Sequence, residues 1–303
     1  MKQERVAKMG VININDLTKD YGNGKGIFNV NIEVKEGEVF GFLGPNGAGK
    51  TTTIRNLLGF IRPDSGNCSI LEMDCFNNAD KIQQHLGYLA GEIAFLDDLK
   101  GRQLIDFIAA MKGVKDKTRI EELIEMFELD PRGKVKKMSK GMKQKIAIIT
   151  AFMTNPEVII LDEPTSGLDP LMQNRFIDLV LEEKKKGRTI FMSSHIFEEI
   201  ERTCDRTAII RDGKIVAIEN MESLAKKKSK VYTVALDSEQ AIEQIKKESF
   251  DITGIEGLQV SIKVKENLNE FLHKLTKYEI KDLDIKKQSL EEIFMHFYGK
   301  DGE

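Results

Sequence analysis

Hydrophobic and polar residues alternate near the start of the chain in the way that half-buried strands require. The alternation covers residues 11–17 and 28–34, and in the second segment Val30, Ile32 and Val34 share one face. Tyr21-Gly22-Asn23-Gly24 between these segments predicts the turn that joins them. The pattern therefore predicts two neighbouring strands, each with one buried side.

Further along, short apolar runs without alternation predict strands that are buried on both faces of a parallel sheet. These runs are Val39–Leu43, Val158–Leu161, Thr189–Met192 and Thr207–Ile210. Asp212-Gly213 follows the last run and predicts a hairpin. A helical pattern begins near Thr52, and another covers most of residues 80–154, with breaks at Gly113 and at 131–133. Strands and helices in this order predict an α/β domain.

The pattern starts again after a lysine-rich stretch at 226–230, which predicts a linker followed by a second domain. The expected strands cover 231–236, 258–264 and 280–285, and the expected helices cover 240–247, a segment from Asn267 to Leu275 and a segment opened by Ser289-Leu290-Glu291-Glu292. We therefore expect a large domain over 1–225 and an accessory α/β domain over 231–303. The accessory domain carries no catalytic group of residues, because His273 and His296 lie on amphipathic patterns where packing or surface roles are expected.

Composition narrows the class of protein. A chain of 303 residues with a net charge of −3 can hold two domains and gives no reason to expect a nucleic-acid partner. Its three cysteines have no metal-binding or C-x-x-C spacing, which is typical of thiols in a reducing compartment. The first residues lack a secretory leader, and the longest apolar run, Ile146–Met153, is too short to cross a bilayer. We expect a soluble chain, so any membrane role needs a separate subunit.

A glycine-rich segment, Gly44–Thr52, lies between an expected strand and an expected helix, the context in which G-x-x-x-x-G-K-[ST] binds phosphate. Glycines let backbone N–H groups converge on an anion, and the helix N-terminus adds partial positive charge. Lys50 can reach the β- and γ-phosphates, and the Thr51 hydroxyl can bind Mg²⁺. The predicted nucleotide-binding residues are Asn46, Gly47, Ala48, Gly49, Lys50, Thr51 and Thr52.

Two adjacent carboxylates, Asp162 and Glu163, end the apolar strand 158–161. Ligands of parallel α/β sheets lie at the carboxyl ends of the strands, so this is the expected edge for a site. Asp162 can hold Mg²⁺, directly or through water, and Glu163 can orient and deprotonate an attacking water. Together with the glycine-rich loop, the pair predicts nucleotide hydrolysis.

Residues 11–225 closely resemble the ATP-binding subunit of an ABC (ATP-binding cassette) transporter. Gly44–Thr52 are similar to its Walker A loop, Val158–Glu163 to its Walker B strand with the catalytic glutamate, and Thr165–Asp169 to its D-loop. The resemblance implies a P-loop NTPase fold: a RecA-like core, an antiparallel β subdomain and a helical signature subdomain at about 81–155. It implies ATP and Mg²⁺ as cofactors.

The roles of three further residues come from the resemblance alone. Tyr21 stands where the family has an aromatic residue that stacks on adenine, although a tyrosine in a turn is more often a packing residue. His195 follows an apolar strand, as the family's switch histidine does, and would contact the γ-phosphate. Asp169 would be the D-loop carboxylate.

Two motifs depart from the family pattern. The signature, usually Leu-Ser-Gly-Gly-Gln, is Met138-Ser139-Lys140-Gly141-Met142 here. Ser139 is predicted to cap a helix that runs to about Thr154, whereas Lys140 and Met142 alter the finer contacts. The family's glutamine, which senses Mg²⁺ and the attacking water and communicates with the membrane subunit, aligns with Gly91. Glu92 either takes over part of its role or is an ordinary glutamate of a surface loop.

The resemblance implies a head-to-tail dimer in which Ser139 and Gly141 of one subunit close over ATP on the other. One complete set of motifs makes a homodimer possible. A separate polytopic membrane subunit would hold the chain at the cytoplasmic face of the membrane, and the domain arrangement is similar to that of exporters of drugs, peptides or other amphipathic compounds. The accessory domain would stabilise the dimer or modulate turnover. The alternatives are a soluble ABC ATPase acting on ribosomes or DNA, and a nucleotide-binding regulator with little catalysis.

Overall fold

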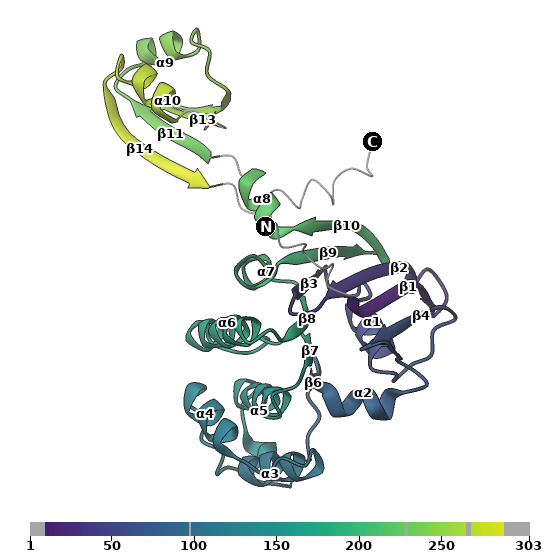
Figure 1. The fold of residues 1–303 in the computed structure, drawn as a ribbon. Coiled ribbons are helices and arrows are strands. Elements are labelled where there is room, and N and C mark those ends of the chain that lie inside the picture. Colours follow the sequence, from purple (N-terminus) through teal and green to yellow (C-terminus); the bar gives the residue numbers. More distant parts are fainter. Residues whose placement is uncertain (1–9, 97, 228–229, 265–267, 288–303) are drawn as a thin grey trace, which may run out of the picture. The chain divides into compact units, whose positions relative to one another are not determined.

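The computed structural model describes residues 10–96, 98–227, 230–264 and 268–287, and it divides the chain into two compact units, Met1–Met221 and Glu222–Glu303 (Figure 1). Of the expected linker, residues 226 and 227 belong to helix α8 (Met221–Lys227) and Lys230 begins strand β11, while 228–229 lie outside the described residues. The domain limits expected from composition stay predictions.

A six-stranded sheet forms the centre of the first unit, with the order β10-β9-β3-β8-β7-β6. Its strands are β3 (Val39–Leu43), β6 (Leu86–Leu89), β7 (Val158–Asp162), β8 (Thr189–Ser194), β9 (Arg206–Arg211) and β10 (Lys214–Asn220). The first five run parallel, and β10 turns back antiparallel to β9 through the predicted Asp212-Gly213 hairpin. Every residue of β3, β7 and β8 is buried, as the apolar runs predicted.

An antiparallel sheet, β2-β1-β4-β5, packs beside the parallel one (Figure 1). Its strands are β1 (Gly10–Asp20), β2 (Gly26–Lys35), β4 (Ser65–Ile70) and β5 (Met73–Asp74). Ile14 of β1 lies opposite Ile32 of β2, and both join a continuous core with Phe40, Phe191 and helix α1 (Lys50–Leu57). The alternation in 11–17 and 28–34 therefore marks the face that this sheet turns to the core.

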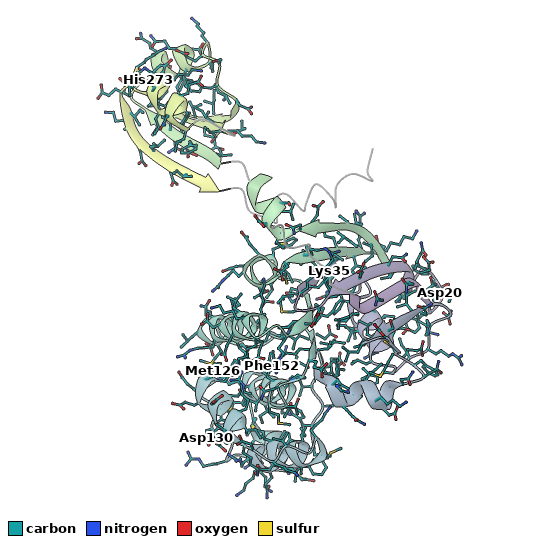
Figure 2. All side chains as sticks on the ribbon, viewed as in Figure 1. Asp20, Lys35, Met126, Asp130, Phe152 and His273 are labelled. Carbon is teal, nitrogen blue, oxygen red and sulfur yellow. The ribbon has the colours of Figure 1, made fainter. Side chains whose placement is uncertain are left out.

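Helices α5 (Lys140–Phe152), α6 (Pro170–Lys185) and α7 (Phe197–Thr203) cover the other face of the parallel sheet. Helices α2 (Ala79–His85), α3 (Gly101–Met111) and α4 (Thr118–Met126) and a short 3₁₀ turn (Val135–Lys137) complete the first unit. Both α3 and α4 contact α5, which gives the helical subdomain that the resemblance implied. Phe152 of α5 is buried and its ring meets that of Phe176 on α6, centroids 6.5 Å apart (Figure 2).

One element inside the expected helical segment 80–154 is a strand. Residues 86–89 form β6, which pairs in parallel with β7. The strand is only four residues long, too short for its period to stand out between two helices. Gly87 also lies so close to α5 that a Cβ there would be 2.2 Å from the carbonyl oxygen of Ala151. Tertiary packing rather than local pattern therefore decides its structure.

After α8, the second unit has the order strand-helix-strand-strand-helix-strand: β11 (Lys230–Leu236), α9 (Glu239–Ile245), β12 (Ile252–Glu256), β13 (Gln259–Val264), α10 (Leu268–Leu275) and β14 (Ile280–Lys287). Its antiparallel sheet has the order β12-β13-β11-β14, the split βαβ arrangement. Tyr232 and Val234 of β11 pack with Phe271 of α10 in its core. The sequence did not predict β12. His273 lies on α10 (Figure 2), and the expected cap at Asn267, the helix opened by Ser289 and His296 lie outside the described residues.

Candidate nucleotide-binding and catalytic site

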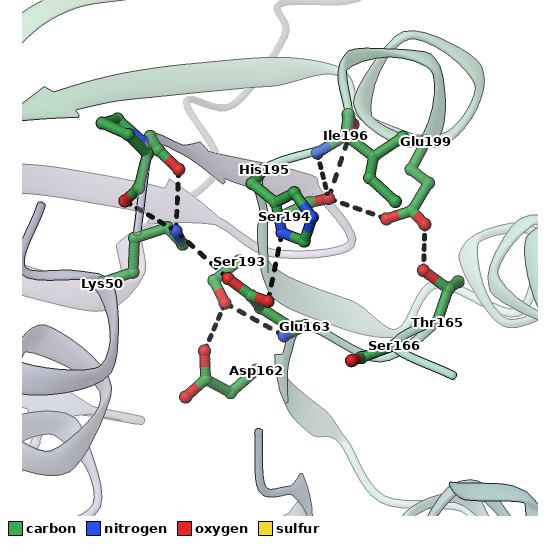
Figure 3. A network of polar contacts seen from close by, with 12 residues as sticks. Lys50, Asp162, Glu163, Thr165, Ser166, Ser193, Ser194, His195, Ile196 and Glu199 are labelled. Atoms are coloured by element: carbon green, nitrogen blue, oxygen red, sulfur yellow. Dashed lines mark hydrogen bonds and ion pairs between the residues drawn. The ribbon is translucent and has the colours of Figure 1, made fainter. Parts of the chain in front are cut away.

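The carboxyl ends of three neighbouring strands, β3, β8 and β7, carry the chemical groups that the sequence singled out. The register pairs Leu43 with Ser194 and Asp162 with Ser193. The glycine-rich loop after β3, the serines and His195 at the end of β8, and Asp162-Glu163 at the end of β7 therefore meet at one edge of the sheet. Figure 3 shows these side chains together.

Lys50 is the first residue of α1 and is only 5% exposed. Its ammonium donates to the carbonyl oxygens of Gly44 (2.7 Å) and Pro45 (3.1 Å). Its Nζ also lies 3.2 Å from Oε1 of Glu163. One positive charge is thus fixed between the loop and the carboxylate at the end of β7.

The loop presents the free N-terminus of α1. Gly49, the residue before the helix, has φ of 111°, and a Cβ there would be 2.6 Å from Cγ2 of Ile27, so only glycine fits. No side chain caps the helix and its first turn has no acidic residue, which leaves N–H groups and partial positive charge for an anion.

A pocket of about 550 Å³ opens over this helix end. Its lining includes Tyr21, Asn46, Gly47, Gly49, Lys50, Thr51, Thr52 and Glu163. Tyr21 is more than half exposed. The predicted residue Ala48 is buried and does not line the pocket; its carbonyl accepts a hydrogen bond from the N–H of Gly213.

Asp162 is 1% exposed, and both of its carboxylate oxygens accept hydrogen bonds from hydroxyls. Thr51 donates to Oδ2 (2.9 Å) and Ser193 donates to Oδ1. A carboxylate beside hydroxyl oxygens suits a small hard cation, and Mg²⁺ bound with phosphate needs only one or two protein carboxylates. The residues present therefore fit Mg²⁺ at Thr51 and Asp162.

Glu163 stands in a tight turn, with φ of 49°, and its N–H donates to the carbonyl oxygen of Ser193. While one of its carboxylate oxygens faces Lys50, the other lies 3.1 Å from Nδ1 of His195. The carboxylate is partly exposed and lines the pocket, so a water could reach it. Position and exposure both suit a general base.

A second cleft, of about 260 Å³, is lined by Asp162 and Glu163 together with Gly91 and Glu92. A Cβ on Gly91 would be 3.1 Å from Oδ2 of Asp162, so a side chain at this position would press on that carboxylate. Burial, with a smaller contribution from the charge of Asp162, raises the pKa of Tyr88 in this cleft to about 12.

The signature residues lie elsewhere on the same chain. Ser139 accepts a hydrogen bond from the N–H of Met142, which confirms the predicted cap, and the helix ends at Phe152 instead of Thr154. Lys140 donates to the hydroxyl of Ser166 (2.8 Å), and a Cβ on Gly141 would be 2.8 Å from the carbonyl oxygen of Gly167. None of residues 139–142 lines the pocket at Lys50.

The predicted D-loop residue Asp169 is accompanied by three residues that the sequence reasoning did not single out: Gln144, Ser193 and Glu199. Asp169 caps α6 by accepting from the N–H of Met172, and Gln144 donates to the carbonyl oxygen of Pro164 (2.6 Å), which ties the signature helix to the loop after Glu163. Ser193 could have been found as a hydroxyl at a strand end. Glu199 could not, because Glu198-Glu199 has the pattern of a solvated helix surface, yet Glu199 is buried.

Comparison with known proteins gives a consistent picture. The family model for the ABC transporter matches residues 27–166. The bacitracin transport ATP-binding protein BcrA of Bacillus licheniformis is 36% identical over 298 residues, which cover 95% of this chain and 97% of that protein.

Solved structures agree at the level of the fold. A structure of the ATP-binding subunit of an ABC transporter is 29% identical and superposes with a TM-score of 0.65 over 71% of this chain and 92% of its own. A dimeric bacterial ABC transporter cassette, 24% identical, superposes with a TM-score of 0.63 over 69% of this chain and 98% of its own. The predicted α/β P-loop fold is thereby confirmed.

Proposed function

The chain belongs to the ATP-binding subunits of ABC transporters, and we propose that it is the motor of an exporter whose channel is a separate membrane subunit. It carries an ABC ATPase domain. The observation that supports a motor most directly is the meeting of Lys50, Asp162 and Glu163 at one sheet edge. In the part of the chain that the structure describes, no helix is both long and apolar enough to cross a bilayer. A membrane partner would hold the chain at the cytoplasmic face.

Nucleotide binding uses the pocket over α1. The N–H groups of residues 46–52 and the ammonium of Lys50 would hold the phosphates of ATP, and Tyr21, which also lines the pocket, would stack on adenine. Thr51 and Asp162 would hold Mg²⁺, which supplies compensating positive charge for the phosphates when it is bound.

Hydrolysis would use the carboxylate of Glu163 as the general base that takes a proton from the attacking water. Lys50, 3.2 Å from this carboxylate, keeps positive charge at the place where the γ-phosphate leaves. His195, 3.1 Å from the other oxygen, would contact the γ-phosphate and respond to its release.

The second half of each ATP site would come from another copy of the chain. Ser139, Lys140, Gly141 and Met142 do not line the pocket of their own subunit, yet the first three residues of this stretch surround a helix N-terminus suited to phosphate. A homodimer with two sandwiched ATP molecules uses the single set of motifs twice. Asp169 would lie at the interface between the two subunits, and ATP hydrolysis would weaken that interface.

The membrane subunit would dock beside the cleft that contains Glu92. Glu92 lines that cleft and an adjoining one of about 340 Å³ with Ile93, Phe95 and Ile108. Nearby helix α3 exposes Phe107 and Met111. Apolar side chains around a cleft suit an apolar helix end of a partner. Glu92 would then relay contact to Asp162 in place of the family's glutamine.

ATPase assays of Glu92→Ala, with and without the membrane subunit, test this relay. We expect the variant to keep its basal rate and to lose stimulation by the partner. Equal rates for variant and wild type in both conditions would remove Glu92 from the mechanism.

The exported compound would be an amphipathic drug or peptide, because BcrA, which resembles this chain over nearly its whole length, is named for bacitracin transport. Purification from detergent-solubilised membranes tests the assignment as a transporter. We expect the tagged chain to bring down a polytopic membrane protein. Recovery with ribosomes or DNA instead would favour the alternative of a soluble ABC ATPase.

A further inference from the structure

A buried carboxylate joins the two loops that hold Glu163 and His195. Glu199, on α7, is only 4% exposed. One of its oxygens accepts a hydrogen bond from the hydroxyl of Thr165, two residues after Glu163, and the other accepts from the hydroxyl of Ser194 (2.8 Å), the residue before His195 (Figure 3). Ser194 in turn accepts from the N–H of Ile196 (2.9 Å), which closes a turn around His195.

This arrangement is costly for the folded state. No described lysine or arginine lies within ion-pair distance of Glu199. Two hydroxyls compensate its burial, with a smaller favourable contribution from His195 and a smaller opposing one from Glu163. Burial raises the pKa of Glu199 above its ordinary value. The folded protein therefore binds this proton more tightly than the unfolded chain does. The stability that this group contributes therefore falls as pH rises through its raised pKa. A buried carboxyl group whose ionisation lowers stability, placed between two loops of the site, points to function.

We propose that Glu199 is a positioning residue for ATP hydrolysis, which locks the loop of His195 to the loop of Glu163. The proposal rests on the proposed roles of Glu163 and His195. The two hydroxyls bind opposite oxygens of one rigid carboxylate, so the loops cannot move apart without breaking a buried hydrogen bond. The 3.1 Å contact between His195 Nδ1 and the Glu163 carboxylate depends on this spacing.

Steady-state ATPase kinetics of Glu199→Gln give the first readout. Because Glu199 does not line the nucleotide pocket, we expect kcat to fall about tenfold, as for loss of a hydrogen bond to a charged group, with KM for ATP unchanged within about twofold. Glu198→Gln is the matched control: its side chain is exposed on the same helix, and we expect wild-type kinetics. An unchanged kcat in Glu199→Gln contradicts the proposal.

Substitutions at Thr165 separate the hydroxyl from the size of the side chain. Thr165→Ser keeps the donor to Glu199 and should retain most of the turnover. Thr165→Val keeps the shape, loses the donor and should match Glu199→Gln. Equal rates for the serine and valine variants would contradict a role for this hydrogen bond.

A double-mutant cycle with His195→Ala tests whether Glu199 acts through His195. We expect Glu199→Gln to cause little further loss in the His195→Ala background. Losses that multiply would show that Glu199 acts independently and would overturn the proposal. If His195→Ala or Glu163→Gln itself keeps wild-type turnover, the proposed function fails, and with it this inference; if both are slow but Glu199→Gln is not, only the inference fails.

Thermal unfolding distinguishes positioning from a structural role. Because the neutral amide avoids the cost of a buried charge, Glu199→Gln should melt at or above the wild-type temperature at pH 7.5 while it hydrolyses ATP more slowly. A variant that is slow and clearly less stable would support a structural role and contradict the proposal.

Discussion

The two units of the molecule differ in what they bury. In the described residues, every buried polar or charged side chain lies between Glu38 and Thr207, in the first unit, and several of them gather at the carboxyl ends of β3, β7 and β8. The buried side chains of the second unit are apolar, with Tyr232 and Phe271 at their centre. Burying polar groups lowers stability, and the first unit buries several of them at the strand ends that form its candidate site.

The second unit follows the pattern of a small, ordinary domain. Its ion pairs are at the surface, as between Lys277 and Glu248 (2.9 Å), where such pairs contribute little to stability. We propose that the two units have different roles: the first would bind and split ATP, and the second would adjust the dimer or its turnover. Changes in the first unit should alter chemistry, and changes in the second should alter only its control.

The largest effect should come from Glu163→Gln. The amide keeps the size of the side chain but cannot take a proton, so we expect kcat to fall about 1,000-fold while ATP binding remains. Bound ATP should then hold the subunits together. Phosphate release and size-exclusion chromatography in ATP measure both effects. Turnover at the normal rate would show that Glu163 is not the base.

Lys50→Ala should come next, as a loss of binding. Removing the ammonium that faces the phosphates should weaken ATP affinity by about 10- to 100-fold, the cost of hydrogen bonds to a charged group. Equilibrium binding of a fluorescent ATP analogue measures the change. Lys81→Ala, an exposed lysine on α2, is the control and should bind normally. If the two variants bound the ATP analogue with equal affinity, Lys50 would have no role in nucleotide binding.

Arg119→Ala tests a buried pair of the first unit that lies away from the site. Arg119 of α4 donates to Glu183 of α6 (2.8 Å), whose side chain is 2% exposed, so its removal leaves a buried charge with fewer partners. We expect the free energy of unfolding to fall by about 3 kcal/mol. Arg132→Ala, which breaks only an exposed pair with Asp130, should unfold like the wild type. Urea denaturation that shows no difference between the two variants would contradict this account of Glu183.

The smallest effect on basal hydrolysis should follow deletion of the residues after Lys230. The second unit lends no residue to the described pocket, so we expect ATP turnover by the remaining protein to stay within about twofold. Dimer stability or stimulation by the membrane subunit should change instead. Unchanged dimerisation, ATPase and transport would remove any role for this unit.

The sequence predicted most strands of the fold and the main residues of the site, because strand periods, apolar runs and the glycine-rich loop are local signals. Their positions along the chain also predicted which strand ends carry Lys50, Asp162 and Glu163. Strand β6 was missed because four residues are too few to show a period. Glu199 was missed because burial of one of two adjacent glutamates depends on how α7 packs, and a single sequence does not encode that locally.

The most direct test of the central claim is phosphate release by the purified wild-type chain, with ATP and Mg²⁺ and again after chelation of the metal. We expect hydrolysis that requires Mg²⁺, because Thr51 and Asp162 offer oxygen ligands beside Lys50 and Glu163. Phosphate release at the same rate without Mg²⁺, or none with Mg²⁺ even after reconstitution with the membrane subunit, would contradict it.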